Sequence, residues 1–321
     1  MVFGQGKNVY NVIDGWGNHF YTPFVEVTGL GIDRNDRIYV LSRGLDPVMI
    51  FNSEGNFLKC WGREYASWPH GICISSDDFV FTADGDHTVK KLTQDGKLLM
   101  TLGKRNHPSD TGCKNKDYRT IKQEAGPFNY PTDVTLDDDG NIYVSDGYGN
   151  SRIHKFSKDG ELLISWGKPG NLPGQFCLPH GIFFFEDTVF VADRENSRIQ
   201  LFSTNGKFID QWVANRPTDI FVHDRKVFVS ELGYNTGLAL KSTEPKDGIK
   251  TARISIFTLK GELLSRWGTD EICKPGSFIA PHCICVDSKD SIYVGEVAIT
   301  SSLSGKVPAN CHTVQKFVKA I

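Results

Sequence analysis

The sequence contains no apolar run close to the ~20 residues that a membrane-spanning helix needs, so no membrane partner is expected. Residues 1–17 show neither a basic segment followed by an apolar run nor a small-residue cleavage site, so no secretory leader is expected. The sequence also lacks a large excess of charge of either sign. Its 36 basic and 38 acidic residues are interspersed and leave a net charge of −2. Such a chain creates no strong electrostatic field that would attract nucleic acid, so no nucleic-acid partner is expected. We also expect the protein to be a monomer.

Paired cysteine motifs and N-glycosylation sequons are also missing. The eight cysteines form no C-x-x-C pair, and several lie inside apolar strand patterns, where a thiol behaves as a small hydrophobic group: Cys73, Cys177 and Cys285. We therefore expect mostly reduced thiols and a cytoplasmic protein. The signatures of several enzyme classes are absent too, namely G-x-S-x-G, the P-loop, H-E-x-x-H and G-x-G-x-x-G.

What the sequence does contain is one phrase repeated six times, starting at 28, 69, 131, 179, 217 and 281. Each copy has two short β-branched or aromatic runs around an Asp/Asn/Gly turn, as in PTDVTLDDDGNIYVSDG, and predicts a β-hairpin. Most copies are followed by a second hairpin, such as RIHKFSKDGELLISWG. Four antiparallel strands in about 40 residues are typical of a propeller blade. The sequence thus predicts an all-β protein, a six-bladed β-propeller that forms a single domain over 1–321.

The ends of the chain and two interruptions refine this prediction. The sixth repeat stops one strand short after HTVQKFVKAI, while VYNVIDGWG at 9–17 copies the phrase that ends the other blades. An N-terminal strand is therefore expected to complete the last blade and to remove exposed edges. Two polar segments with Gly and Pro, 104–127 and 232–252, break the period and are expected to be loops that overhang a face.

One position of the repeat carries the clearest chemical signal. It follows a Pro and holds His70, His180 and His282 in repeats two, four and six, but Thr132 and Thr218 in repeats three and five. Alternate blades of a six-fold ring lie about 120° apart, so we expect the three imidazoles to converge with three-fold symmetry. Three His ligands with an open fourth position are the arrangement of a catalytic zinc. The alternative is that Pro-His-Gly is simply a turn.

The other histidines fall outside this position, and a surface or turn role is the default expectation for them: His19, His87, His107, His154, His223 and His312.

Residues just after the second strand of each blade should lie on the same face as the three histidines. Acidic residues there are expected to serve turns and blade packing: Asp84, Asp146, Asp193, Glu231 and Glu296. Three other residues stand out nearby, namely Arg43, Tyr148 and Arg194. A phenol and two guanidinium groups beside a metal ion suit a general base and an anion clamp, and the cations would favour the phenolate.

These phrases resemble a known family, the catalytic domain of peptidyl-α-hydroxyglycine α-amidating lyase, which belongs to the NHL-repeat propellers. The likeness spans nearly the whole chain and is strongest over 126–205, in SDGYGNSRI and PGQFCLPHGIFFFEDTVFVADRENSRIQLF. The resemblance implies a zinc enzyme that cleaves the carbinolamide C–N bond of an α-hydroxyglycine and releases an amide and glyoxylate. It matches His70, His180 and His282 to the zinc ligands, Tyr148 to the base, and Arg43 and Arg194 to the active-site arginines.

The resemblance also implies a structural calcium ion bound partly by backbone carbonyls, at positions that match Leu30 and Ile72. Cys283 stands where the family has an acidic calcium ligand, so this sequence offers one ligand fewer. Neither family disulfide can form, because other residues occupy both members of each pair: Asn129 with Gly149, and Phe190 with Leu201. Losing both pairs fits a reducing compartment.

Two alternatives stay open. One is a related zinc lyase or hydrolase that acts on a different small molecule, in a pocket reshaped by the insertions at 104–127 and 232–252. The other is a non-catalytic NHL scaffold that binds a protein or RNA, although the near-neutral charge and the lack of a basic patch disfavour it. For an enzyme, the expected partner is a small-molecule or peptide-terminal substrate.

Overall fold

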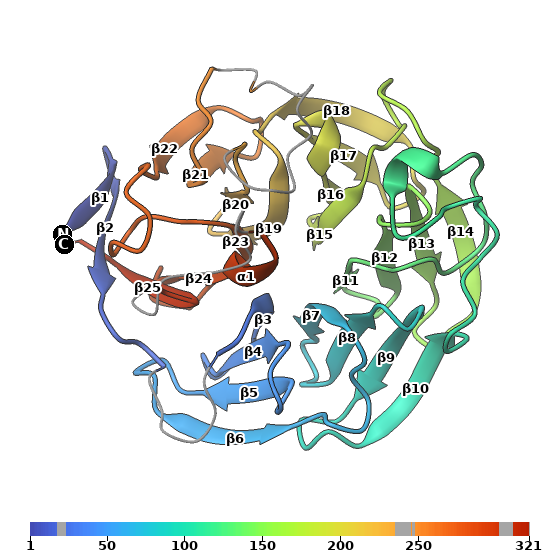
Figure 1. Cartoon of the computed structure of the whole chain (residues 1–321), viewed down its shortest axis with the longest axis horizontal. Helices are drawn as coiled ribbons and strands as arrows, with labels where there is room; N and C mark the ends of the chain where they lie inside the picture. Colours follow the sequence, from blue (N-terminus) through green and yellow to red (C-terminus); the bar gives the residue numbers. More distant parts are fainter. Residues whose placement is uncertain (18–23, 235–244, 246–247, 302–310, 321) are drawn as a thin grey trace. The chain divides into compact units, whose positions relative to one another are not determined.

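The residues that the structure describes form six antiparallel sheets, one for each repeat. The computed structural model, a six-bladed β-propeller, confirms the predicted fold and describes residues 1–17, 24–234, 245, 248–301 and 311–320 (Figure 1). By internal contacts the chain divides into two compact units, one formed by Met1–Arg63 with Val213–Ile321 and the other by Glu64–Trp212.

The unit Glu64–Trp212 holds three blades in which consecutive strands are neighbours. The strands of its first blade are β7 (Pro69–Ile74), β8 (Val80–Asp84), β9 (Thr88–Leu92) and β10 (Leu98–Gly103). The second blade contains β11 (Asp133–Leu136), β12 (Ile142–Asp146), β13 (Arg152–Phe156) and β14 (Leu162–Trp166). The third contains β15 (Pro179–Phe185), β16 (Thr188–Asp193), β17 (Arg198–Ser203) and β18 (Phe208–Val213). Two short 3-10 helices accompany them, η1 (Tyr118–Thr120) and η2 (Arg194–Asn196).

The other unit contains the remaining three blades. One is built from β3 (Val27–Ile32), β4 (Ile38–Ser42), β5 (Val48–Phe51) and β6 (Phe57–Trp61). The next has β19 (Pro217–His223), β20 (Lys226–Glu231), β21 (Arg253–Thr258) and β22 (Leu263–Trp267). The last has β23 (Pro281–Val286), β24 (Ile292–Glu296) and β25 (Val314–Lys319), followed in the sheet by β2 (Asn8–Ile13) and β1 (Val2–Gln5). The helix α1 (Ala298–Ser301) follows β24.

The N-terminal residues close the last blade, as predicted. Tyr10 pairs with Lys319 in the antiparallel ladder between β2 and β25, so the two ends of the chain lie side by side (Figure 1). The sequence predicted one strand over 9–17, whereas the structure has an additional strand, β1, paired with β2. Tyr10 is fully buried and stacks on Trp267 with ring centroids 5.6 Å apart, which anchors the closing strand in the hydrophobic core of its unit.

The hairpin turns explain why the repeat phrase folds as it does. In the second blade of the Glu64–Trp212 unit, Asp137 Oδ1 accepts the backbone N–H groups of Asp139 and Asn141. Gly140 adopts a φ of +81°, which a residue without a Cβ takes up at little cost. On either side of the turn, alternate residues of the strands enter a core that includes Val134 and Ile142.

The acidic residues after the second strands have the packing role that the sequence predicts. Each side-chain carboxylate accepts backbone N–H groups from the loop that precedes the first strand of its own blade. The bonded pairs are Asp84 with Ser67 and Trp68, Asp146 with Asn129, Asp193 with Cys177, Glu231 with Asn215, and Glu296 with Ile279 and Ala280. All five acids are buried, so a lost partner would leave a buried polar group unpaired, which is costly.

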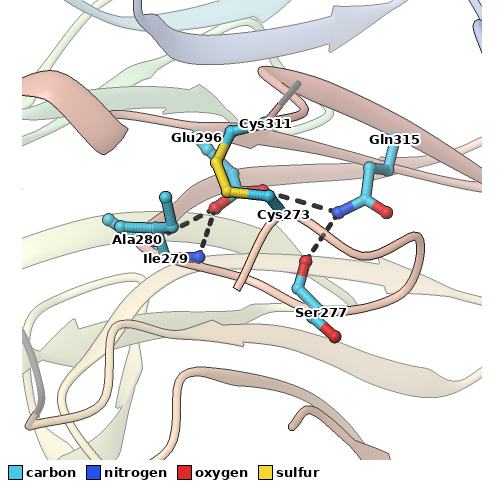
Figure 2. The surroundings of a disulfide bond; sticks show 7 residues. All are labelled: Cys273, Ser277, Ile279, Ala280, Glu296, Cys311 and Gln315. Carbon is cyan, nitrogen blue, oxygen red and sulfur yellow. Dashed lines mark hydrogen bonds between the residues drawn. A yellow bond between two sulfur atoms is a disulfide. The ribbon is translucent and has the colours of Figure 1, made fainter. Parts of the chain in front are cut away.

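Figure 2 shows the region around Glu296, where a disulfide joins Cys273 to Cys311. Beside it, the Gln315 side-chain amide donates to the carbonyl oxygen of Ser277 at 2.9 Å. Burial raises the pKa of Glu296 to about 7, against the lowering effect of the amide groups that donate to it. The disulfide and these hydrogen bonds together hold the loop that leads into β23.

The expectation of mostly reduced thiols is confirmed for six cysteines, which are free in the structure: Cys60, Cys73, Cys113, Cys177, Cys283 and Cys285. The Cys273–Cys311 disulfide is the exception. It removes part of the support for a cytoplasmic location, since disulfides persist in oxidising compartments.

Two further expectations concern the non-repeating segments. The insertion 104–127 lies within the Glu64–Trp212 unit and contains η1. The insertion predicted at 232–252 falls largely outside the described residues. Among the residues that the structure describes, no helix is long and apolar enough to cross a membrane.

Thiol titration tests the disulfide. The unfolded protein, purified without reductant, should react with six equivalents of a thiol reagent, because six cysteines are free and two are paired. After reduction it should react with eight, the full cysteine content. Eight reactive thiols before reduction would contradict the Cys273–Cys311 bond.

Candidate metal centre

The three histidines of the repeated position occupy the first strands of their blades, in β7, β15 and β23, and all are buried. In each case the ladder with the second strand changes register at or beside the histidine, between Pro69 and Gly71, between Pro179 and Ile182, and between Pro281 and Cys283. Such a bulge takes a residue out of the regular alternation and re-aims its side chain. The Pro-His-Gly phrase is therefore more than a surface turn.

Hydrogen bonds fix the orientation of two of these rings. His70 Nδ1 lies 2.7 Å from the Thr132 carbonyl oxygen, and His282 Nδ1 lies 2.8 Å from that of Thr28. Because a carbonyl oxygen only accepts, each Nδ1 carries the proton and donates it. Nε2 is then left with its lone pair, as in most metal-ligating histidines.

Threonine at the alternating position supports the neighbouring histidine strand. The Thr132 hydroxyl donates a hydrogen bond to the Pro179 carbonyl oxygen at 3.0 Å. The Thr218 hydroxyl donates in the same way to the Pro281 carbonyl oxygen at 2.9 Å. These prolines directly precede His180 and His282. The structure adds Thr28 to the same position of the first repeat, so threonine and histidine alternate through all six copies, a regularity that a complete alignment of the repeats would have shown.

Tyr148 lies next to two of the histidines within the Glu64–Trp212 unit. Its hydroxyl oxygen is 3.3 Å from His70 Nε2 and 3.5 Å from His180 Nε2. The two imidazole rings themselves have centroids 4.8 Å apart. The structure thus brings together three of the residues that the sequence singled out, with the phenol facing the Nε2 atoms of both histidines.

Arg194 completes this part of the site. It begins η2, is 4% exposed, and points Nη1 at the Tyr148 hydroxyl oxygen at 3.4 Å, while its Nε pairs with Glu195 at 2.8 Å. Burial alone would lower the pKa of Arg194, but Tyr148 and Glu195 together raise it above its usual range. The guanidinium is therefore a permanent positive charge beside the phenol.

A metal ion fits this donor set. Within the Glu64–Trp212 unit, one ligand atom of His70 and one of His180 lie within 4.8 Å of each other, close enough to bind the same metal ion. Imidazole ligands suit zinc and several other divalent ions, and backbone carbonyl groups fix the Nδ1–H donors of His70 and His282.

The remaining predicted site residues lie in other surroundings. Arg43 belongs to the unit that contains both termini, where it pairs with Glu26 at 2.9 Å and contacts Thr300. Leu30 and Ile72 are buried within β3 and β7, where they pair with Val40 and Thr82. The calcium ion that the resemblance implied at these two positions stays a prediction.

The surface or turn expectation is wrong for His154. This residue is fully buried in β13, with Nδ1 2.7 Å from the Ser165 hydroxyl and Nε2 3.3 Å from Asp146. Its equivalents in neighbouring repeats, such as Gln200, also bond the carboxylate after the second strand. His154 is therefore a structural partner of that carboxylate rather than a ligand.

Comparison with known proteins shows that the chain is similar to NHL-repeat proteins and to amidating enzymes. Residues 128–156 match the NHL repeat model. The chain is 33% identical over 219 residues to a peptidylglycine alpha-amidating monooxygenase of Rattus norvegicus, covering 64% of this chain and 20% of that protein. It is 34% identical over 180 residues to a probable peptidyl-alpha-hydroxyglycine alpha-amidating lyase of Caenorhabditis elegans, covering 54% and 45%. The chain is an amidating-lyase-like NHL-repeat protein.

This amidating-lyase-like protein is also similar in sequence to a human NHL-repeat protein and similar in fold to a bacterial lyase. It is 27% identical over 330 residues to NHL repeat-containing protein 3 of Homo sapiens, covering 95% of this chain and 86% of that protein. The virginiamycin B lyase of Staphylococcus aureus shares the fold, with a TM-score of 0.59, 14% identity and 99% coverage of both chains. The chain spans only about a fifth of the rat relative, 20% of its length.

The threonine support can be tested with Thr132→Val. This change keeps the shape but removes the hydroxyl from Ser145 and Pro179, so the free energy of unfolding should fall by about 1–3 kcal/mol. Chemical denaturation would measure the loss. Thr101→Val, on an exposed strand position of β10, is the matched control and should change it by no more than about 0.5 kcal/mol. Equal effects in the two variants would contradict the supporting role of Thr132.

Proposed function

We propose that this protein is a zinc-dependent lyase that cleaves the carbinolamide C–N bond of an α-hydroxyglycine-type substrate, releasing an amide and glyoxylate. The observation that carries the proposal is the position of the Tyr148 hydroxyl, within 3.5 Å of the Nε2 atoms of His70 and His180, two of the three histidines that we propose as metal ligands. The resemblance to amidating lyases supports the same activity.

His70, His180 and His282 would hold the zinc ion. Zinc, when bound, supplies a Lewis acid that makes a hydroxyl group more acidic at neutral pH. The protein fixes the donor geometry through the Nδ1 hydrogen bonds of His70 and His282, which keep each Nε2 turned toward the site.

Tyr148 is the proposed base. In its deprotonated form it accepts the proton of the substrate hydroxyl, the oxygen forms the aldehyde C=O bond, and the electron pair of the C–N bond leaves with the nitrogen. Tyr148 then returns the proton to that nitrogen, so the products are a neutral amide and glyoxylate. Proton transfer by a positioned side chain of this kind contributes about 10²–10⁴-fold to the rate.

Arg194 is proposed to bind the substrate carboxylate, since it is a buried cation directly beside the base. Arg43 keeps its predicted role as a second arginine, in which Glu26 would fix its position.

Metal content and product release test the proposal together. Purified, desalted protein should contain about one zinc per chain by plasma mass spectrometry, and it should release glyoxylate from α-hydroxyhippurate. His180→Ala should lose both properties, whereas His107→Ala, an exposed histidine in the insertion, should keep them. Zinc without glyoxylate would favour a related lyase or hydrolase on another small molecule. No metal in the wild-type protein would favour a non-catalytic NHL scaffold.

Tyr148→Phe separates binding from chemistry. The variant keeps the ring that packs against Trp68 and His70 but has no hydroxyl to move a proton. The zinc content should stay at the wild-type level, while kcat should fall by about 100-fold or more. A near-normal kcat would remove Tyr148 as the base.

A further inference from the structure

The insertion 104–127 is bound directly to the turn that carries Tyr148. The buried Thr111 donates its hydroxyl to the Gly149 carbonyl oxygen at 2.5 Å, and Cys113 Sγ lies 3.7 Å from the Tyr148 carbonyl oxygen. From the other side, Asn129 Nδ2 donates to the Thr111 hydroxyl at 3.1 Å. The insertion is therefore a fixed neighbour of the proposed base.

A tight turn at the tip of the insertion presents Lys116. Asn115 and Lys116 both adopt left-handed backbone conformations, with φ of +54° and +58°, and an antiparallel bridge between Lys114 and Asp117 closes the turn. The Asp117 carboxylate accepts two hydrogen bonds from Arg119 at 2.6 Å.

The Lys116 side chain lies on the aromatic residues next to the site. Its Nζ is 3.9 Å from the ring centroid of Trp68 and 4.7 Å from that of Tyr130. Trp68 in turn contacts Tyr148 and His70, with ring centroids 5.6 Å and 5.4 Å apart. The positive charge of Lys116 therefore lies one indole ring away from the base and a metal ligand, and Lys116 itself is exposed to solvent.

The charge of the insertion differs from that of the whole chain. Residues 104–127 contain six basic and three acidic side chains, although the protein has a net charge of −2. A cationic segment held beside the active site attracts anionic ligands. The buried Arg194 is a separate positive group, bound to Tyr148 and Glu195.

We propose that Lys116 determines substrate specificity by binding a carboxylate on the amide portion of the substrate. This inference rests on the proposed lyase function. Arg194 would bind the carboxylate of the hydroxyglycine portion, and Lys116 would bind a second one on the portion that leaves as the amide. The preferred substrates are α-hydroxyglycine derivatives whose acyl group ends in a carboxylate, such as those of dicarboxylic acids or of peptides with an acidic last residue.

Two substrates of similar length test the proposal, glutaryl-α-hydroxyglycine and its uncharged counterpart pentanoyl-α-hydroxyglycine. The wild-type protein should favour the glutaryl substrate about fivefold in kcat/KM, mainly through KM, as expected for one solvent-exposed ion pair. Lys116→Met should bring this ratio to about one. Lys114→Met, which removes the same charge at the other end of the tip, should leave the ratio at its wild-type value and is the matched control.

The two proposals can fail separately. Turnover of both substrates with equal kcat/KM in the wild-type protein, or an unchanged ratio in Lys116→Met, would overturn the specificity role and leave the lyase function in place. If neither substrate releases glyoxylate, the lyase function fails, and calorimetric binding of glutaramic acid and pentanamide decides the role of Lys116. Tighter binding of glutaramic acid that is lost in Lys116→Met supports it, and equal binding of the two amides overturns it.

Discussion

A buried carboxylate at the end of the second strand fixes where the first strand of the same blade begins, and the metal-capable position depends on this bond. Asp84 accepts the Trp68 amide at 2.9 Å, and Glu296 accepts the Ala280 amide at 3.0 Å, each two residues before a histidine. Because these groups are buried, the amide cannot exchange its partner for water, and the strand start is held in one place. The bulge that follows then turns the imidazole out of the ladder.

Threonine and histidine alternate at the repeated position and have different roles. The histidines offer imidazole nitrogen atoms to a metal ion, and the threonines orient and anchor the histidine strands. Thr132 uses its carbonyl oxygen to accept the His70 Nδ1 proton and its hydroxyl to bond the Pro179 carbonyl oxygen. One small residue thus orients one ring and anchors the strand of the next. A histidine in its place would offer the same backbone carbonyl but could not make the short hydroxyl contacts, so the alternating pattern serves structure as well as ligand number.

The repeated parts of the molecule could be predicted from the sequence, because equivalent positions in six copies reveal a role that a single copy hides. This holds for the blades, the closing strand and the histidine position. The burial of His154 was missed, although the same position holds Gln200 and other polar partners of the carboxylate. The Cys273–Cys311 disulfide joins two non-repeating segments 38 residues apart, and no local pattern indicates such a contact.

Departures from the repeat decide what the site can distinguish. Three imidazoles on alternate blades are chemically alike, so by themselves they cannot distinguish one end of a substrate from the other. Tyr148 and Arg194 break this equivalence within the Glu64–Trp212 unit, since they place a phenol and a cation beside only some of the ligands. The insertion adds Lys116 on Trp68, again on a single blade. In the proposed lyase, the direction in which a substrate binds would therefore come from these non-repeating groups, while the repeat would supply the three histidines and the residues that support them.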